Sequence, residues 1–142
     1  MDQQEFMFLI PGVIYGIAIF DLLSIIRSNK IYWESLLWVL LLFFCIVSIL
    51  FNLFPKLEAI TSNIRIYTFF LFSPILFAHS CFLLTPKEEN TDLKHQFHQN
   101  RKAFFLSASG VITVGLILNY IGIKSSMIYL NIIGLSLFLL NV

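Results

Sequence analysis

The chain has 142 residues, of which 58% are apolar or aromatic and only 12% are charged. A soluble domain of this size exposes too much surface to be coated by so few charges, so the composition excludes an ordinary soluble fold. The net charge of +1 and the lack of a nucleic-acid-binding motif exclude nucleic acid as a partner. The apolar side chains must therefore face lipid, and the bilayer is the first partner that the sequence indicates.

Four long apolar segments predict membrane-spanning helices, at residues 6–26, 35–54, 64–84 and 103–123. At about 1.5 Å per residue, a helix of this length matches the ~30 Å hydrocarbon core of a bilayer. A fifth segment, residues 127–142, reaches only roughly 24 Å and predicts a short spanning or near-spanning helix. The expected fold class is all-α, a polytopic transmembrane helical bundle that forms one domain over residues 1–142.

The positive charges are distributed unevenly between the connections. The first and third connections carry six of them, Arg27, Lys30, Lys87, Lys94, Arg101 and Lys102, and the others carry Lys56, Arg65 and Lys124. Because Lys and Arg collect on the cytoplasmic side of short loops, we expect an N-terminus outside and a cytoplasmic polar loop at 85–102. The first apolar run lacks a small-residue cleavage site, so we interpret it as a retained helix of a multi-pass protein.

The polar loop 85–102 contains two helical patterns. Thr85 with Glu88 matches a capping box, which predicts a helix start at that point. Leu93, Phe97 and Phe104 share one helical face, which favours an amphipathic extension of the fourth helix. The candidate contacts for a cytoplasmic protein partner are the basic side chains of this loop, Lys94, His95, His98, Arg101 and Lys102.

Asp21 and His79 are the candidates for polar or ion chemistry inside the membrane. An ionised Asp within the core costs about 2.5–3.5 kcal/mol on insertion scales, so such a residue usually faces the protein interior. Both residues lie about five positions before the cytoplasmic ends of their predicted helices, where a carboxylate and an imidazole can share a proton or hold an ion. Two alternatives stay open. Asp21 can lie hydrated at the interface or pair with Arg27 or Lys30, and a neutral His79 can bond to a backbone carbonyl or to Ser80.

Small residues at helical spacing predict close packing between helices. Gly12 and Gly16 form a G-x-x-x-G pair in the first segment, which is a pattern that lets two helices approach closely. The fourth segment repeats the theme with Ser107, Gly110 and Gly115. The pattern does not say whether these faces pack within one chain or between copies, and the second case predicts self-association.

The sequence predicts neither an enzyme nor a cofactor. His95 and His98 stand three apart with Glu89 and Asp92 nearby, but two histidines and a loose carboxylate do not predict a metal site. The motifs H-E-x-x-H, G-x-S-x-G and the Walker A loop are missing, so no catalytic residue is assigned. Cys45 and Cys81 lie in apolar runs, and we interpret them as small buried hydrophobic residues.

The opening of the chain resembles that of small bacterial multi-pass proteins without an assigned activity. The resemblance covers about the first 40 residues and rests on residues 15–23 (Tyr-Gly-Ile-Ala-Ile-Phe-Asp-Leu-Leu), Tyr32-Trp33 and Leu37-Trp38. It implies a bacterial inner membrane and makes Asp21 part of a local signature. In general plan, the chain is also similar to membrane components of bacterial anti-phage systems.

Two functions compete at this point. The first is an oligomeric, membrane-embedded interaction or effector component, in a bacterial defence or stress system, because almost nothing of the chain lies outside the bilayer. The second is an ion or proton pathway through a channel-like oligomer or small transporter, with Asp21 and His79 as its polar groups. We prefer the interaction component, because a single chain of five thin helices seldom encloses a pore.

Overall fold

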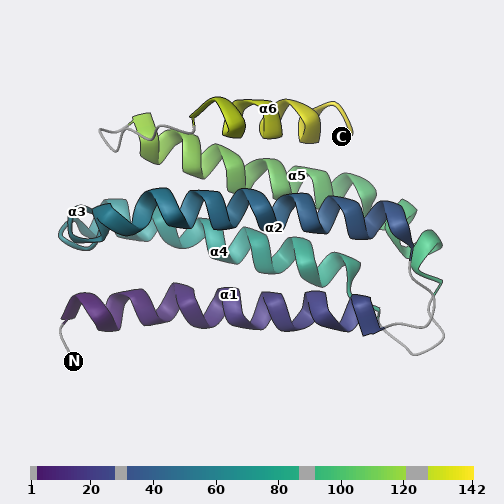
Figure 1. Cartoon of the computed structure of the whole chain (residues 1–142), viewed down its shortest axis with the longest axis horizontal. Helices are drawn as coiled ribbons and strands as arrows, with labels where there is room; N and C mark the ends of the chain where they lie inside the picture. The colour runs from purple at the N-terminus through teal and green to yellow at the C-terminus, as the bar shows by residue number, and fades with distance from the viewer. Residues whose placement is uncertain (1–2, 28–31, 87–91, 121–127) are drawn as a thin grey trace.

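The fold is helical throughout the part of the chain that the computed structural model describes, residues 3–27, 32–86, 92–120 and 128–142. Its helices are α1 (Gln3–Arg27), α2 (Trp33–Leu53), the 3₁₀ turn η1 (Phe54–Lys56), α3 (Leu57–Thr61), α4 (Ile64–Leu84), α5 (Leu93–Tyr120) and α6 (Ile128–Leu139) (Figure 1). The expected all-α class is therefore confirmed. Uniformly apolar sequence favours helices in lipid because a helix satisfies its own backbone hydrogen bonds.

Three helices are long and apolar enough to cross a membrane: Glu5–Ser24 in α1, Ile64–Leu84 in α4 and Leu93–Leu118 in α5. The described apolar stretch of α2, Trp33–Ser48, is shorter. Three of the four expected long spans thus have the required length, and α2 as a fourth span stays a prediction. α6 has 12 residues, or about 18 Å, which is too short for the ~30 Å core.

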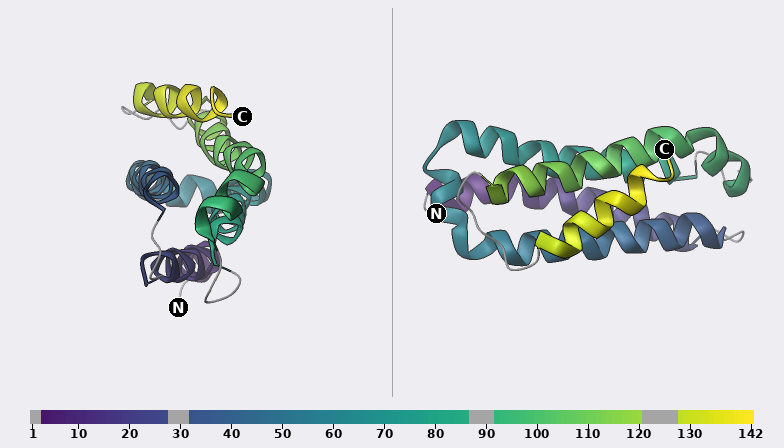
Figure 2. Two further views of the ribbon diagram at one scale, coloured as in Figure 1. Left: turned by 90° about the vertical axis from the view of Figure 1, so that its right-hand side faces the viewer. Right: turned by 90° about the horizontal axis from the view of Figure 1, so that it is seen from above.

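The long helices form a row, with α2 standing to one side of it. α4 contacts α1 on one side and α5 on the other, and α6 packs on α5. Figure 2 shows α2 beside this row, with slight contact to α1. α1 and α4 run in the same direction, and the Tyr67 hydroxyl donates to the backbone carbonyl of Met7 (2.5 Å) near the start of both. The short helix α3 bridges α2 and α4 at this end of the molecule.

Aromatic side chains tie α2, α5 and α6 together. Phe104, Phe105 and Phe138 are fully buried, and the ring of Trp38 packs edge-on against Phe105 with 4.8 Å between centroids. Trp38 also lies 5.2 Å from the ring of Phe138 in α6. We call Trp38, Phe104, Phe105 and Phe138 the aromatic cluster. Together with Gly134, which lies against Cys45 and Ile112, the aromatic cluster holds α6 on the bundle.

Helix α5 begins at Leu93, ten residues before the expected span at Ala103. The carboxylate of Asp92 accepts the backbone N–H of Lys94 (3.0 Å), which caps the new helix start, and Leu93 and Phe97 are buried. The amphipathic extension of the fourth helix is therefore present. Thr85 does not act as the expected N-cap. It ends α4, where its hydroxyl donates to the carbonyl of Cys81 (2.9 Å), while Glu88 lies outside the described residues.

Two amide side chains of α5 satisfy the backbone carbonyls at the end of α4. The Gln96 amide donates to the carbonyls of Leu83 (3.2 Å) and Thr85 (2.7 Å). The Asn100 amide donates to the same Leu83 carbonyl (3.0 Å). The last carbonyls of a helix have no partner within the helix, so these bonds fasten α5 to the end of α4.

Gly110 allows α4 and α5 to pack closely. A small and a large side chain at this position are therefore expected to have different effects on stability. A Cβ at Gly110 would lie 3.0 Å from Cδ1 of Leu76, the far end of a flexible side chain. We expect Gly110→Ala to change stability by less than about 1 kcal/mol, because the gain in helix propensity offsets the shift of Leu76. Gly110→Leu is expected to cost about 1–3 kcal/mol by overpacking. Thermal unfolding in detergent measures both, and equal stability of Gly110→Leu and the native chain would contradict the close contact.

Candidate functional site

The structure gives Asp21 and His79 different partners. Asp21 is half-buried in α1, and it interacts electrostatically with the Cys81 thiol of α4. His79 is exposed on α4, and its Nδ1 lies 2.7 Å from the hydroxyl of Ser107 in α5. Residues two apart on a helix do not share a face, so the Cys81 and His79 sides of α4 point in different directions. The hydrogen-bond partner of His79 is Ser107 rather than the expected Ser80, whose hydroxyl donates to the carbonyl of Leu76.

The small residues of α5 pack inside the chain. Gly110 lies against Leu76, Gly115 is buried, and buried Ser107 bonds to His79. Ser107 and Gly110 therefore belong to the contact between α4 and α5, and Gly115 belongs to the interior of the chain. They contribute to the fold of one copy rather than offering a surface to another.

The glycine pair of α1 is open. Gly12 and Gly16 are exposed, and a Cβ at either position would meet nothing within 4 Å. Among the three candidate spans, α1 has the smallest buried share, 22% of its most apolar window against 56% in α5. Val13, Ile17 and Phe20 are exposed beside the glycines. We call this surface, Gly12, Val13, Gly16, Ile17 and Phe20, the open face of α1.

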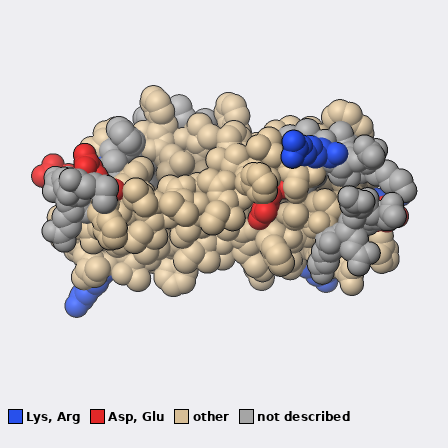
Figure 3. Space-filling view, turned by 90° about the horizontal axis from the view of Figure 1, so that it is seen from below, with Lys and Arg blue, Asp and Glu red and all other residues tan. Residues whose placement is uncertain are grey.

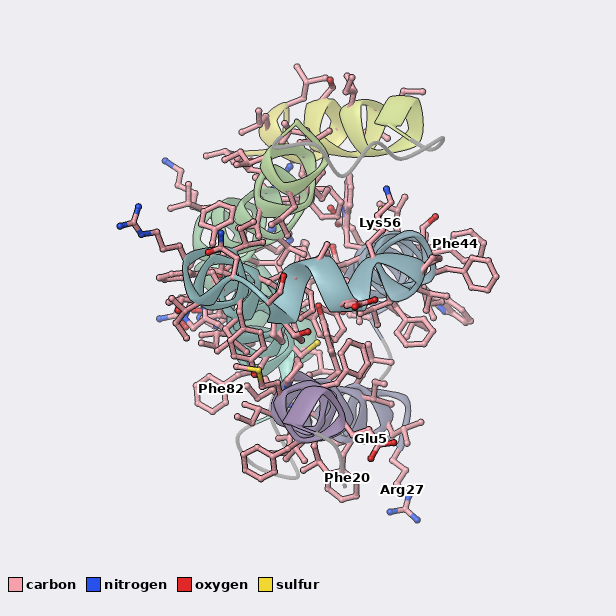
Figure 4. All side chains as sticks on the ribbon, turned by 90° about the vertical axis from the view of Figure 1, so that its left-hand side faces the viewer. Glu5, Phe20, Arg27, Phe44, Lys56 and Phe82 are labelled. Carbon is pink, nitrogen blue, oxygen red and sulfur yellow. The ribbon has the colours of Figure 1, made fainter. Side chains whose placement is uncertain are left out.

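A cavity of about 570 Å³ lies between α1 and α2, next to the open face. Its lining comes from both helices and the turn after α2: Phe8, Pro11, Gly12, Tyr15, Val47, Leu50, Phe51 and Pro55. The Tyr15 hydroxyl is 3.2 Å from that of Ser73, so the polar group of this lining already has a partner. Figure 4 shows how far the outer side chains project: Phe20, Phe44 and Phe82 point away from the bundle, from α1, α2 and α4. This apolar groove and exterior suit hydrocarbon or another apolar helix.

On the face that Figure 3 shows, charged side chains gather towards the two ends of the molecule, and the surface between them is largely apolar but includes acidic atoms. The end at which α5 begins carries the described basic residues Arg27, Lys94, Arg101 and Lys102, against Glu34 and Asp92. The other end carries Lys56 and Arg65 against Glu5 and Glu58. Over the described residues, the first end has a formal excess of two positive charges and the second end is balanced.

The five candidate contact residues of the polar segment do not form one group. The Arg101 guanidinium donates to the side-chain oxygen of Asn141 (3.0 Å) and lies 5.8 Å from the centroid of the Phe105 ring. It is thus engaged inside the chain. The remaining four residues, Lys94, His95, His98 and Lys102, are exposed on the outer side of α5, and we call them the basic face.

Tyr32 connects the start of α2 with the basic face and gives this end a pH-dependent group. Its ring packs against those of Phe97 and His98, and its hydroxyl donates to the Glu34 carboxylate. This hydrogen bond is the main cause that raises the pKa of Tyr32, helped by desolvation and the Glu34 charge, while Arg101 lowers it.

Titration of the Tyr32 phenol is expected to depend on Glu34. The folded pKa is raised, so this group's stabilising effect is complete below its ordinary value of about 10 and is lost as the pH rises through the folded value. The phenolate absorbance of Tyr32 is obtained by subtracting the spectrum of Tyr32→Phe from that of the same chain with Tyr32. When Glu34→Gln is present in both members of the pair, this absorbance should therefore appear at lower pH than in the native pair. An unchanged difference spectrum in Glu34→Gln would show that the hydrogen bond does not hold the proton.

The described residues contain no group of three or more His, Cys, Asp or Glu side chains placed to hold a metal ion. His95 and His98 lie on the exposed side of α5, while Glu89 falls outside the described residues. The open face of α1 and the basic face of α5 are therefore the surfaces that the geometry offers for function. Comparison with protein-family profiles, with curated proteins and with solved structures finds no match to this chain.

Proposed function

We propose that this chain is a membrane-embedded interaction component that self-associates through the open face of α1. The observation that carries the proposal is the glycine pair: Gly12 and Gly16 present bare helix backbone outward, with nothing of their own chain within 4 Å of a Cβ. The comparable small residues of α5 are already used within the fold. Of these two groups of small residues, the one on α1 is therefore exposed and available to a second copy.

The chemistry of the bilayer favours a helix as the occupant of this face. Lipid tails are as apolar as Leu, so helices associate in membranes through close packing rather than through the hydrophobic effect. Gly12 and Gly16 permit that close approach, and exposed Val13 and Ile17 provide side chains to interlock with a partner. Gly12 also borders the cavity between α1 and α2, which offers room for a side chain of the second copy.

The ion or proton pathway has weaker support. Its motivating residues, Asp21 and His79, lie beside different partners, Cys81 and Ser107. The cavity between α1 and α2 has an apolar lining, which holds neither water nor ions well. An assembly of copies remains the way in which such a pathway would form, so self-association is the property to establish first.

Energy transfer between donor-labelled and acceptor-labelled copies in liposomes tests the proposal. We expect transfer that exceeds random proximity and that falls as lipid is added, because dilution in the membrane dissociates a reversible complex. A mixture with an unrelated single-span helix of similar length provides the proximity baseline. Transfer at the baseline over the full dilution range would reject self-association.

A further inference from the structure

We propose that the basic face of α5 binds the anionic headgroups of phospholipids in the leaflet at its own end of the molecule. This inference goes beyond self-association and uses a different helix. The basic face presents Lys94, His95, His98 and Lys102 outward, at the end that carries the excess of positive charge. Lys94 and His95 stand in the first turn of α5, next to the Asp92 carboxylate that caps the helix, and Lys94 and Lys102 together outnumber this acidic group.

The length of α5 places the basic face at headgroup level. Its 28 residues extend about 42 Å, which exceeds the ~30 Å hydrocarbon core by about 12 Å, or eight residues. The first turns of α5 therefore project into the polar region, and Lys102 lies close enough to extend its ammonium group there. Trp33, 69% exposed at the start of α2, is at the same end, as expected for an interfacial aromatic residue.

The fold also holds the basic face in a fixed orientation. Leu93 and Phe97 are buried on the opposite side of the helix, and Gln96 and Asn100 bond to the end of α4. The helix that carries the basic face therefore does not have to be ordered when a ligand binds, which lowers the entropic cost of binding.

The composition of the face favours lipid over protein. Protein interfaces draw most of their affinity from buried Trp, Tyr and Arg side chains. The exposed positions within Leu93–Lys102 are Lys94, His95, His98, Gln99 and Lys102, and Arg101 is directed inward to Asn141. Such a set lacks an anchor for a protein pocket, but it complements a layer of phosphate groups.

Quenching of tryptophan fluorescence by brominated lipids in nanodiscs tests this inference with the full chain. Trp33 reports on the leaflet that contacts the basic face. We expect brominated phosphatidylglycerol to associate about fivefold or more tightly than brominated phosphatidylcholine, with the preference weakening as salt is raised. In the double variant Lys94→Gln and Lys102→Gln, the preference should fall below about twofold, whereas Lys94→Arg with Lys102→Arg should retain it.

The control and the contrary outcomes are distinct. Arg65→Gln removes an exposed charge at the opposite end and should leave the preference unchanged. Equal quenching by both lipids in the native chain, or a preference that survives in the double glutamine variant, overturns the proposal. Binding of a polyglutamate peptide in phosphatidylcholine nanodiscs, without a lipid preference, overturns it in favour of an acidic protein. None of these results bears on self-association, because α1 is unchanged throughout.

Discussion

Gly16→Leu is expected to weaken self-association of this chain by about tenfold or more. In its own copy, a side chain at position 16 meets open space, so the fold of each copy should be unaffected. At a helix–helix contact, the same leucine holds the two backbones apart and removes the close packing on which association in lipid depends. A tenfold loss corresponds to about 1.4 kcal/mol, a modest fraction of a packed helix interface. Energy transfer between labelled copies, measured as lipid is added, gives the dissociation constant.

The matched control for Gly16→Leu is Ile75→Leu, which changes an exposed side chain of α4, away from the open face of α1, at nearly constant volume. It should leave both the fold and the association unchanged. Thermal unfolding in detergent separates the two effects in each variant. If Gly16→Leu copies associate as tightly as native ones, the open face of α1 is not the contact, even if the chain is oligomeric.

Phe138→Ala is expected to loosen α6 from the rest of the molecule. Phe138 is fully buried, and its ring lies 5.2 Å from that of Trp38, 5.8 Å from that of Phe105 and 6.3 Å from that of Phe104. Truncation leaves a cavity in the aromatic cluster. We expect a loss of about 2 kcal/mol, below the range for soluble proteins, because lipid rather than water replaces the lost contacts.

Hydrogen exchange measured by mass spectrometry should locate this effect in α6 and not in α4. The emission of Trp38 should change as well, because its ring is in contact with Phe138. Ile133→Ala, at an exposed position of the same helix, serves as the comparison and should leave both signals near the native values. Unchanged exchange in α6 of Phe138→Ala would show that other contacts hold this helix.

The bounds of α1, α2 and α4 could be predicted closely, because an apolar run between polar residues marks the start and end of such a helix. The expected segment 64–84 coincides with α4, and α1 and α2 begin within three residues of their expected starts. The start of α5 at Leu93 was visible as an amphipathic pattern, but the amide bonds from Gln96 and Asn100 were not foreseen. The spacing of four between these two polar residues, on the inner side of the extension, is the signal that would have shown them.

The partners of the candidate residues were much harder to predict. Helices that are apolar on every side carry no stripe that fixes their rotation, so the sequence cannot tell whether His79 faces Asp21 or Ser107. For the same reason, the sequence could not show that Gly12 and Gly16 are exposed whereas Gly110 packs against another helix. Arg101 was likewise predicted to be a partner contact together with Lys94 and Lys102, but its guanidinium bonds to Asn141, 40 positions along the chain.

The way in which α4 ends has a consequence for the substitutions that the chain can tolerate. The carbonyls of Leu83 and Thr85 accept hydrogen bonds from Gln96 and Asn100, two residues that belong to the next helix, whereas the carbonyls of Cys81 and Phe82 accept from Thr85. Side chains of α5 therefore fasten the end of α4 directly. A change at Gln96 removes the bond to the Thr85 carbonyl together with one of the two bonds to the Leu83 carbonyl, whereas a change at Asn100 leaves Leu83 with its bond from Gln96, so the first position is expected to tolerate substitution less well than the second.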